Sequence, residues 1–171
     1  MPINPAHLHL ALNHLPVLGV LFGTVLLALA LWRRNDTLQR TSLVVLLLTG
    51  LAAGGVYLTG EPAEGVIEKA AGVSDTQIER HEDAAAVATT GAALLGLAAL
   101  VLLWRSRRTG RMSAPFLTAT FVLGVLTTGA MAWTANLGGQ IRHPELRGAV
   151  AAVEAGQGQP VSGEGRERDR D

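Results

Sequence analysis

The residues best suited to chemistry in this sequence are its histidines and a group of carboxylates. The five histidines are His7, His9, His14, His81 and His143, and cysteine is absent. A neutral imidazole can ligate haem iron or a transition metal, and a carboxylate beside it suits zinc, iron or manganese. Without cysteine, disulfides, Cys-ligated iron–sulfur clusters and covalently attached c-type haem are excluded.

Four residues form the predicted cofactor-binding set: His14, His81, His143 and Arg142. Two neutral imidazoles from different helices can hold haem b axially, and Arg142 can pair with a propionate or an acidic side chain. For a divalent metal such as zinc or iron, Glu61 and Glu82 join the three histidines as candidate ligands. The Glu-x-x-His pattern of di-iron bundles precedes none of these histidines, which argues against a regular di-iron centre. The remaining two, His7 and His9, are interpreted as flexible N-terminal residues.

Four charge-free segments must position these side chains: 14–32, 41–60, 84–104 and 116–137. A bilayer core of about 30 Å needs about 20 apolar residues of helix, and each segment meets that length. The whole chain is 16% charged, against about 25% in soluble domains. The sequence therefore predicts an all-α integral membrane protein. Its four-helix bundle covers 1–148, and a disordered polar tail follows over 149–171.

The charges between the spans predict the orientation in the membrane. Seven arginines lie in the connections 33–40 and 105–111, whereas the connection 61–83 carries seven acidic residues against two basic ones. The positive-inside rule places the arginines in the cytoplasm. Two helical hairpins then leave both termini outside, in the periplasm or extracellular space. A short amphipathic helix is expected within 61–72, and the candidate site residues gather at the outer mouth of the bundle.

The composition also limits the partners. Fourteen basic and fourteen acidic residues cancel, which argues against nucleic-acid binding. The expected partners are the lipid bilayer and either a membrane redox partner or further copies of the chain. No nucleophile–His–acid arrangement is recognisable, which points away from an enzyme. The spans carry no charged residue that would mark an ion path.

Four separated motifs give the chain a family resemblance. They lie at 13–16 (Asn-His-Leu-Pro), 58–64 (Leu-Thr-Gly-Glu-Pro-Ala-Glu), 72–82 and 138–143 (Gly-Gly-Gln-Ile-Arg-His). The chain resembles bacterial four-helix inner-membrane proteins catalogued as a domain of unknown function, over about residues 7–147. The resemblance implies the fold and the membrane location, and it carries no established activity or ligand. Because some members of the wider family are joined to redox modules, it favours haem binding or electron transfer.

Two functional hypotheses follow from the sequence. In the first, the protein holds haem b or a divalent metal at its outer mouth and serves electron transfer. In the alternative, it is a structural or accessory membrane subunit without a cofactor, and its outer polar cluster only satisfies helix ends. The orientation of His14 and His81 tests the first hypothesis, which fails if both rings face lipid or bulk water.

Overall fold

The computed structural model describes residues 4–67 and 75–143, and every regular element within them is a helix. The helices are α1 (Pro5–Leu12), α2 (His14–Arg33), α3 (Asp36–Tyr57), α4 (Gly60–Ile67), α5 (Asp75–Thr109) and α6 (Ala114–Arg142). The all-α prediction is therefore confirmed. The helix expected within 61–72 corresponds in part to α4, while its end and the predicted polar tail at 149–171 lie outside the described residues.

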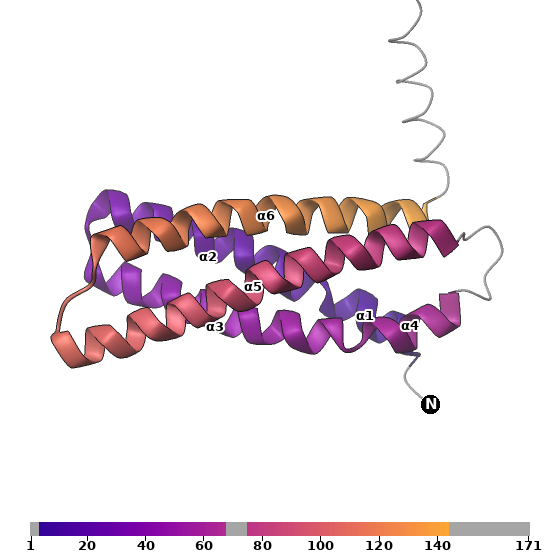
Figure 1. The fold of residues 1–171 in the computed structure, drawn as a ribbon, viewed down its shortest axis with the longest axis horizontal. Coiled ribbons are helices and arrows are strands. Elements are labelled where there is room, and N and C mark those ends of the chain that lie inside the picture. Colours follow the sequence, from indigo (N-terminus) through magenta and orange to yellow (C-terminus); the bar gives the residue numbers. More distant parts are fainter. Residues whose placement is uncertain (1–3, 68–74, 144–171) are drawn as a thin grey trace, which may run out of the picture.

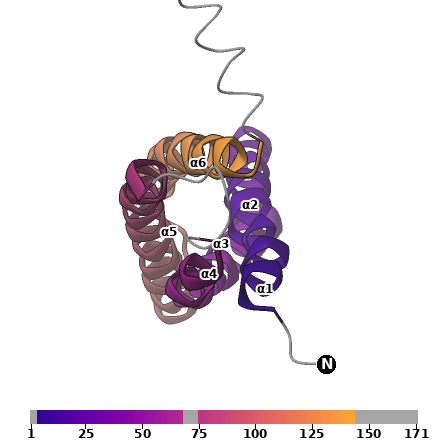
Figure 2. The same cartoon turned by 90° about the vertical axis from the view of Figure 1, so that its right-hand side faces the viewer.

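The four long helices form an antiparallel bundle (Figure 1). Around the bundle, α3 packs against α2 and α5, and α6 packs against α5 and α2 (Figure 2). In the described part of the chain, four helices are long and apolar enough to cross a membrane. The predicted bundle of four apolar helices is thus confirmed. The start of α1 and the end of α6, the first and last described helices, lie at the same end of the bundle (Figure 1).

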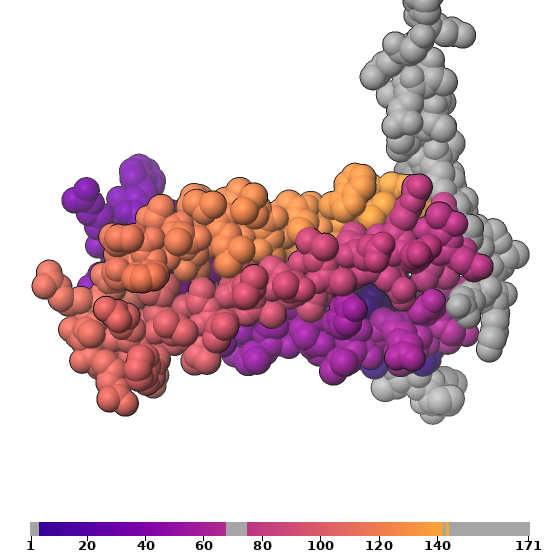
Figure 3. Space-filling view, in the orientation of Figure 1, coloured from indigo at the N-terminus to yellow at the C-terminus, as the bar shows by residue number. Residues whose placement is uncertain are grey.

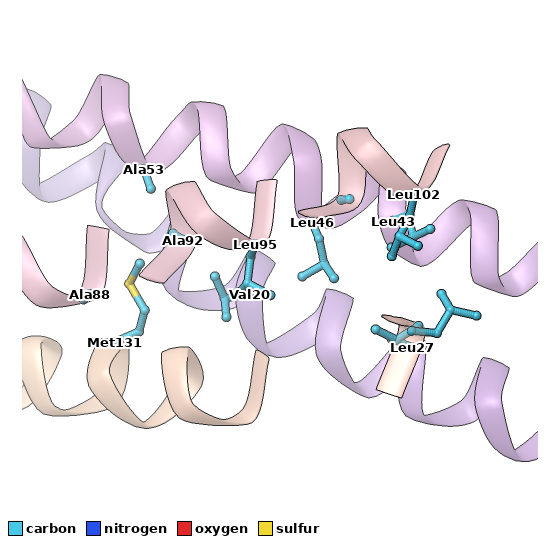
Figure 4. Close-up of a cluster of buried hydrophobic side chains, with 12 residues drawn as sticks. Val20, Leu27, Leu43, Leu46, Ala53, Ala88, Ala92, Leu95, Leu102 and Met131 are labelled. Atoms are coloured by element: carbon cyan, nitrogen blue, oxygen red, sulfur yellow. The ribbon is translucent and has the colours of Figure 1, made fainter. Parts of the chain in front are cut away.

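The interior of the bundle is mainly apolar, with several buried threonines and serines among its leucines and alanines. Leu27, Leu43, Leu46 and Leu95 are fully buried at its centre (Figure 4). The outside is apolar as well: Phe22, Leu51 and Leu126 are 61%, 67% and 66% exposed. Exposing side chains of this size to water costs about 1.5–3 kcal/mol each relative to burying them. A hydrocarbon environment removes that cost, so the lateral surface suits a bilayer.

Contacts between glycine and threonine bring neighbouring helices close together. Three such pairs connect the long helices: Gly19 with Thr49, Gly91 with Thr127, and Gly124 with Thr24. A Cβ atom added at Gly19 or Gly124 would lie 2.5 Å from the facing threonine Oγ1, and one at Gly91 would lie 2.8 Å away. Small residues permit this close approach in membrane bundles, where lipid provides no hydrophobic driving force between helices.

The two ends of the bundle carry opposite charges. At the end we call the basic end, the connections after α2 and α5 carry seven arginines and one aspartate over 33–40 and 105–111. Gly110, with φ 68°, ends α5 in the left-handed conformation that glycine adopts without strain. At the opposite, acidic end lie Glu61, Glu64, Asp75, Glu79, Glu82 and Asp83.

A break between α1 and α2 turns the first helix out of the axis of the second. Pro16 lacks a backbone N–H, and its ring clashes with the carbonyl four residues earlier, at Leu12. The Nδ1 atom of His14 lies 2.9 Å from the carbonyl oxygen of Leu10 and so caps the last turn of α1. Beyond the break, α1 packs against α4 at the acidic end (Figure 1).

Candidate functional site

The first component of the candidate site is His9 on α1, which is half-buried. Its Nδ1 atom lies 2.8 Å from Oγ1 of Thr59, the residue that connects α3 to α4. The hydroxyl of Thr59 donates its own hydrogen to the carbonyl of Val56 at 2.6 Å. Because the Thr59 hydroxyl hydrogen is used in the bond to Val56, the Thr59 oxygen can only accept a hydrogen bond from Nδ1–H of His9. The hydrogen on the imidazole therefore lies on Nδ1, and Nε2 carries a lone pair.

The second component is His81 on α5, which is also half-buried. Its Nδ1 atom lies 3.1 Å from the backbone carbonyl oxygen of Thr134 on α6. A carbonyl only accepts hydrogen bonds, so Nδ1 of His81 is the donor and its Nε2 carries the lone pair. The ring also packs against α6, where a Cβ atom added at Gly138 would lie 3.0 Å from Cε1.

The two rings together form a pair of imidazoles at the acidic end of the bundle. His9 lies on α1 and His81 near the start of α5, and both helices reach the acidic end of the bundle. Each ring donates Nδ1–H to a protein oxygen, the arrangement that orients imidazole ligands of metals and makes their other nitrogen more basic. The structure thus supplies two nitrogen donors, from α1 and α5, whose tautomers are set by the protein.

The interpretation of His9 as a flexible N-terminal residue is wrong, because His9 lies in helix α1 and is tied to Thr59. The sequence does contain a signal for this helix. Asn4 caps it by accepting a hydrogen bond from the backbone N–H of Ala6 at 2.9 Å, and Pro5 occupies its first turn. An asparagine followed by proline is a typical helix start.

The structure places the predicted ligand His14 outside the histidine pair. His14 is exposed, and its Nδ1 atom is occupied by the carbonyl of Leu10. His143 is exposed at the end of α6, and the side chain of Arg142 lies outside the described part of the structure. Of the histidines and the arginine predicted to bind a cofactor, His81 is therefore the one that joins the imidazole pair.

The two predicted carboxylate ligands are exposed near this pair. Glu61 lies on α4, and Glu82 lies on α5, where its carboxyl group meets that of Glu64. Glu64 lies outside the membrane-spanning segment predicted over 41–60, so its carboxyl group is not placed in the hydrocarbon region. The pKa of Glu64 is raised because it hydrogen-bonds to and is repelled by the carboxyl of Glu82, with smaller contributions from Glu61 and Asp75. These side chains thus give the acidic end of the bundle a negatively charged surface.

The donor set distinguishes between the two cofactor classes. Within residues 4–67 and 75–143, no group of three or more His, Asp or Glu side chains is arranged to hold a metal ion. The five predicted metal ligands His14, His81, His143, Glu61 and Glu82 are therefore not assembled there. Zinc sites use three or four protein ligands, whereas a haem needs only one or two axial ligands. The two imidazoles are fewer than the protein ligands of a zinc site and equal in number to the axial ligands that a haem can take.

A family model described as predicted membrane protein (DUF2231) matches residues 5–144. The chain belongs to the DUF2231 family. The match extends from the start of α1 to the end of α6, so the first helix and His9 are part of the DUF2231 domain. The expected membership of a four-helix membrane family of unknown function is confirmed. Neither the curated proteins nor the solved structures contain a significant match to the chain.

Proposed function

We propose that this membrane protein binds haem b at the acidic end of its bundle, that His9 and His81 would hold it, and that it serves electron transfer. The observation that carries the proposal is that the two imidazoles have the same tautomer, with the hydrogen on Nδ1. Both Nδ1–H groups are engaged by protein oxygens, and both Nε2 lone pairs remain for a ligand. In this proposal, His9 takes the role that the sequence suggested for His14.

The protein's own residues orient the donors. Thr59 holds the ring of His9, and the carbonyl of Thr134 holds the ring of His81. Haem b, when bound, supplies one-electron redox chemistry. Arg142 and His143 stay candidates for contacts with its propionates, because both follow the Gly-Gly pair that closes α6.

The charges around the site suit an electron-transfer role. Glu61, Glu64 and Glu82 give the acidic end a negative field, which favours the more positive, oxidised state of a bound redox group. We further propose that the protein lies in a bacterial inner membrane, with its basic end in the cytoplasm and the histidine pair outside. An electron donor or acceptor would then reach the site from the outer side.

A reduced-minus-oxidised visible spectrum of the full-length protein, purified in detergent from haem-replete cells, tests the proposal. We expect a Soret band that disappears in His9→Ala and in His81→Ala. His7→Ala is the matched control, because His7 is an exposed histidine on the same helix, and it should keep the band. Imidazole added to His9→Ala should restore the band, which separates a lost ligand from a lost fold.

The other outcomes are informative as well. A band that survives in both His9→Ala and His81→Ala would overturn the assignment of these ligands. A colourless protein with stoichiometric zinc, iron or manganese by elemental analysis would replace haem with a metal ion. A protein with neither signal would be a structural or accessory subunit.

A further inference from the structure

A second site lies on the lateral surface, at a distance from the histidines. A groove of about 350 Å³ runs between α5 and α6 toward the basic end. Its walls include Leu94, Leu97, Val101 and Phe116, all of which are about half exposed or more. Arg105 lies at the end of the groove and is the charged residue of its lining. Figure 3 shows this face of the molecule, with α5 and α6 side by side.

The groove exists because α5 and α6 separate along their length. Nearer the acidic end, the backbone of Gly91 approaches Thr127 so closely that a Cβ atom would lie 2.8 Å from Oγ1. Toward the connection 110–113 the two helices diverge (Figure 1), and large side chains form the walls. The hydroxyl of Thr120 in the lining bonds to the carbonyl of Phe116 at 2.8 Å, so it leaves the groove apolar.

The length of the groove matches one leaflet of a bilayer. Leu94 and Arg105 are eleven positions apart in one helix, which is about 16 Å at the α-helical rise per residue. Half of a bilayer core is about 15 Å thick. Trp104, exposed beside Arg105, is the residue type found where the hydrocarbon meets the headgroups. A groove of this length, with Leu94 near the middle of the bilayer, would place Arg105 at the level of the lipid phosphates.

The charge at this level favours an anionic lipid. The segment 105–113 contains four arginines and no acidic residue. The guanidinium of Arg108 stacks on Trp104 at 5.2 Å from the ring centroid, and Arg40 donates to Ser106 at 3.2 Å. Within the described residues, no acidic side chain pairs with Arg105. Basic pockets between membrane helices are typical sites for anionic lipid headgroups.

We propose that this groove binds one anionic phospholipid, with an acyl chain between α5 and α6 and the phosphate on Arg105. The bound chain would fill the space that the diverging helices leave and would hold α5 and α6 together at the basic end. The acidic end of the bundle repels the same headgroup, so binding is confined to the leaflet at the basic end.

Native mass spectrometry of the full-length, delipidated protein tests this proposal. The protein is titrated with phosphatidylglycerol and with phosphatidylcholine of identical acyl chains. We expect phosphatidylglycerol to bind about fivefold more tightly, the size of one arginine–headgroup attraction near the membrane surface. Arg105→Gln should reduce the preference to less than twofold. Arg107→Gln is the matched control, because it removes the same charge two positions away and outside the groove lining.

A second variant tests the groove itself. Ala98→Phe places a ring in the lining and should weaken both lipids equally, since it occupies the space of the acyl chain. Equal affinities for the two lipids, or equal losses in Arg105→Gln and Arg107→Gln, would overturn the proposal. Oleate that competes as well as phosphatidylglycerol would show that a fatty acid, and not a phospholipid, is the occupant.

Discussion

Gly138 on α6 lies directly against the imidazole of His81 on α5. A Cβ atom at Gly138 would be 3.0 Å from Cε1 and 3.3 Å from Nδ1 of that ring. The same ring donates a hydrogen bond to the carbonyl of Thr134, one turn earlier on α6. The absence of a side chain at Gly138 therefore leaves room for the imidazole of His81 beside α6.

Gly138→Ala should displace the ring of His81. The added methyl group is closer than ordinary van der Waals contact, so either the ring or the helix must shift, at a cost of about 1–3 kcal/mol. Gly139→Ala is the matched control, because nothing lies within 4 Å of its added Cβ, and alanine is about 1 kcal/mol better than glycine in a helix. Thermal unfolding in detergent should rank Gly139→Ala above Gly138→Ala. Equal melting temperatures would contradict the contact with His81.

Thr59→Val should release His9 while keeping the shape of the side chain. The substitution removes the oxygen that accepts from Nδ1 of His9, at a cost of about 0.5–1.5 kcal/mol in the free energy of unfolding. Thr59→Ser retains the hydroxyl and should stay near the parent protein. The nitrogen chemical shifts of His9 report the same change independently. If the Nδ1–H tautomer persisted unchanged in Thr59→Val, the assignment of the donor would be wrong.

Gly124→Ala should loosen the packing of α6 on α2. The added Cβ would lie 2.5 Å from Oγ1 of Thr24, which is buried and has no hydrogen-bond partner among the described residues. We expect a loss of about 1–3 kcal/mol, partly recovered by Thr24→Ala in a double mutant. Gly129→Ala, on the same helix but facing open space, serves as the control. A Gly124→Ala protein as stable as Gly129→Ala would contradict the close approach.

The pair of Glu64 and Glu82 should make stability depend on pH. The pKa of Glu64 is raised in the folded protein, so the fold favours the protonated carboxyl. Stability from this group is therefore present below its unfolded pKa and is lost as the pH rises through the folded pKa. Glu64→Gln should flatten this dependence and raise the melting temperature slightly at neutral pH. Glu79→Gln, on the exposed start of α5, provides a comparison in which the slope should remain.

The candidate site was partly predictable from the sequence. His81 was predicted because a histidine at the start of a charge-free helix lies at the mouth of a bundle. His9 was not, because it precedes the first predicted span, 14–32, and was interpreted as flexible, although Asn4 and Pro5 mark a helix start. His14 was predicted as a ligand because it lies at the edge of an apolar span. In the structure, its ring instead caps the end of α1.

The amino-acid sequence was sufficient to predict the class of protein and its long helices. Hydropathy over about 20 consecutive residues is a local property, and so is the absence of charge in four segments. Tertiary structure alone decided which histidines meet. The direction of the ring of His9 depends on the break at Pro16 and on the packing of α1 against α4. These two features decide which side of α1 faces the rest of the bundle. That packing brings together residues that are far apart in the chain, and local sequence patterns do not predict such contacts.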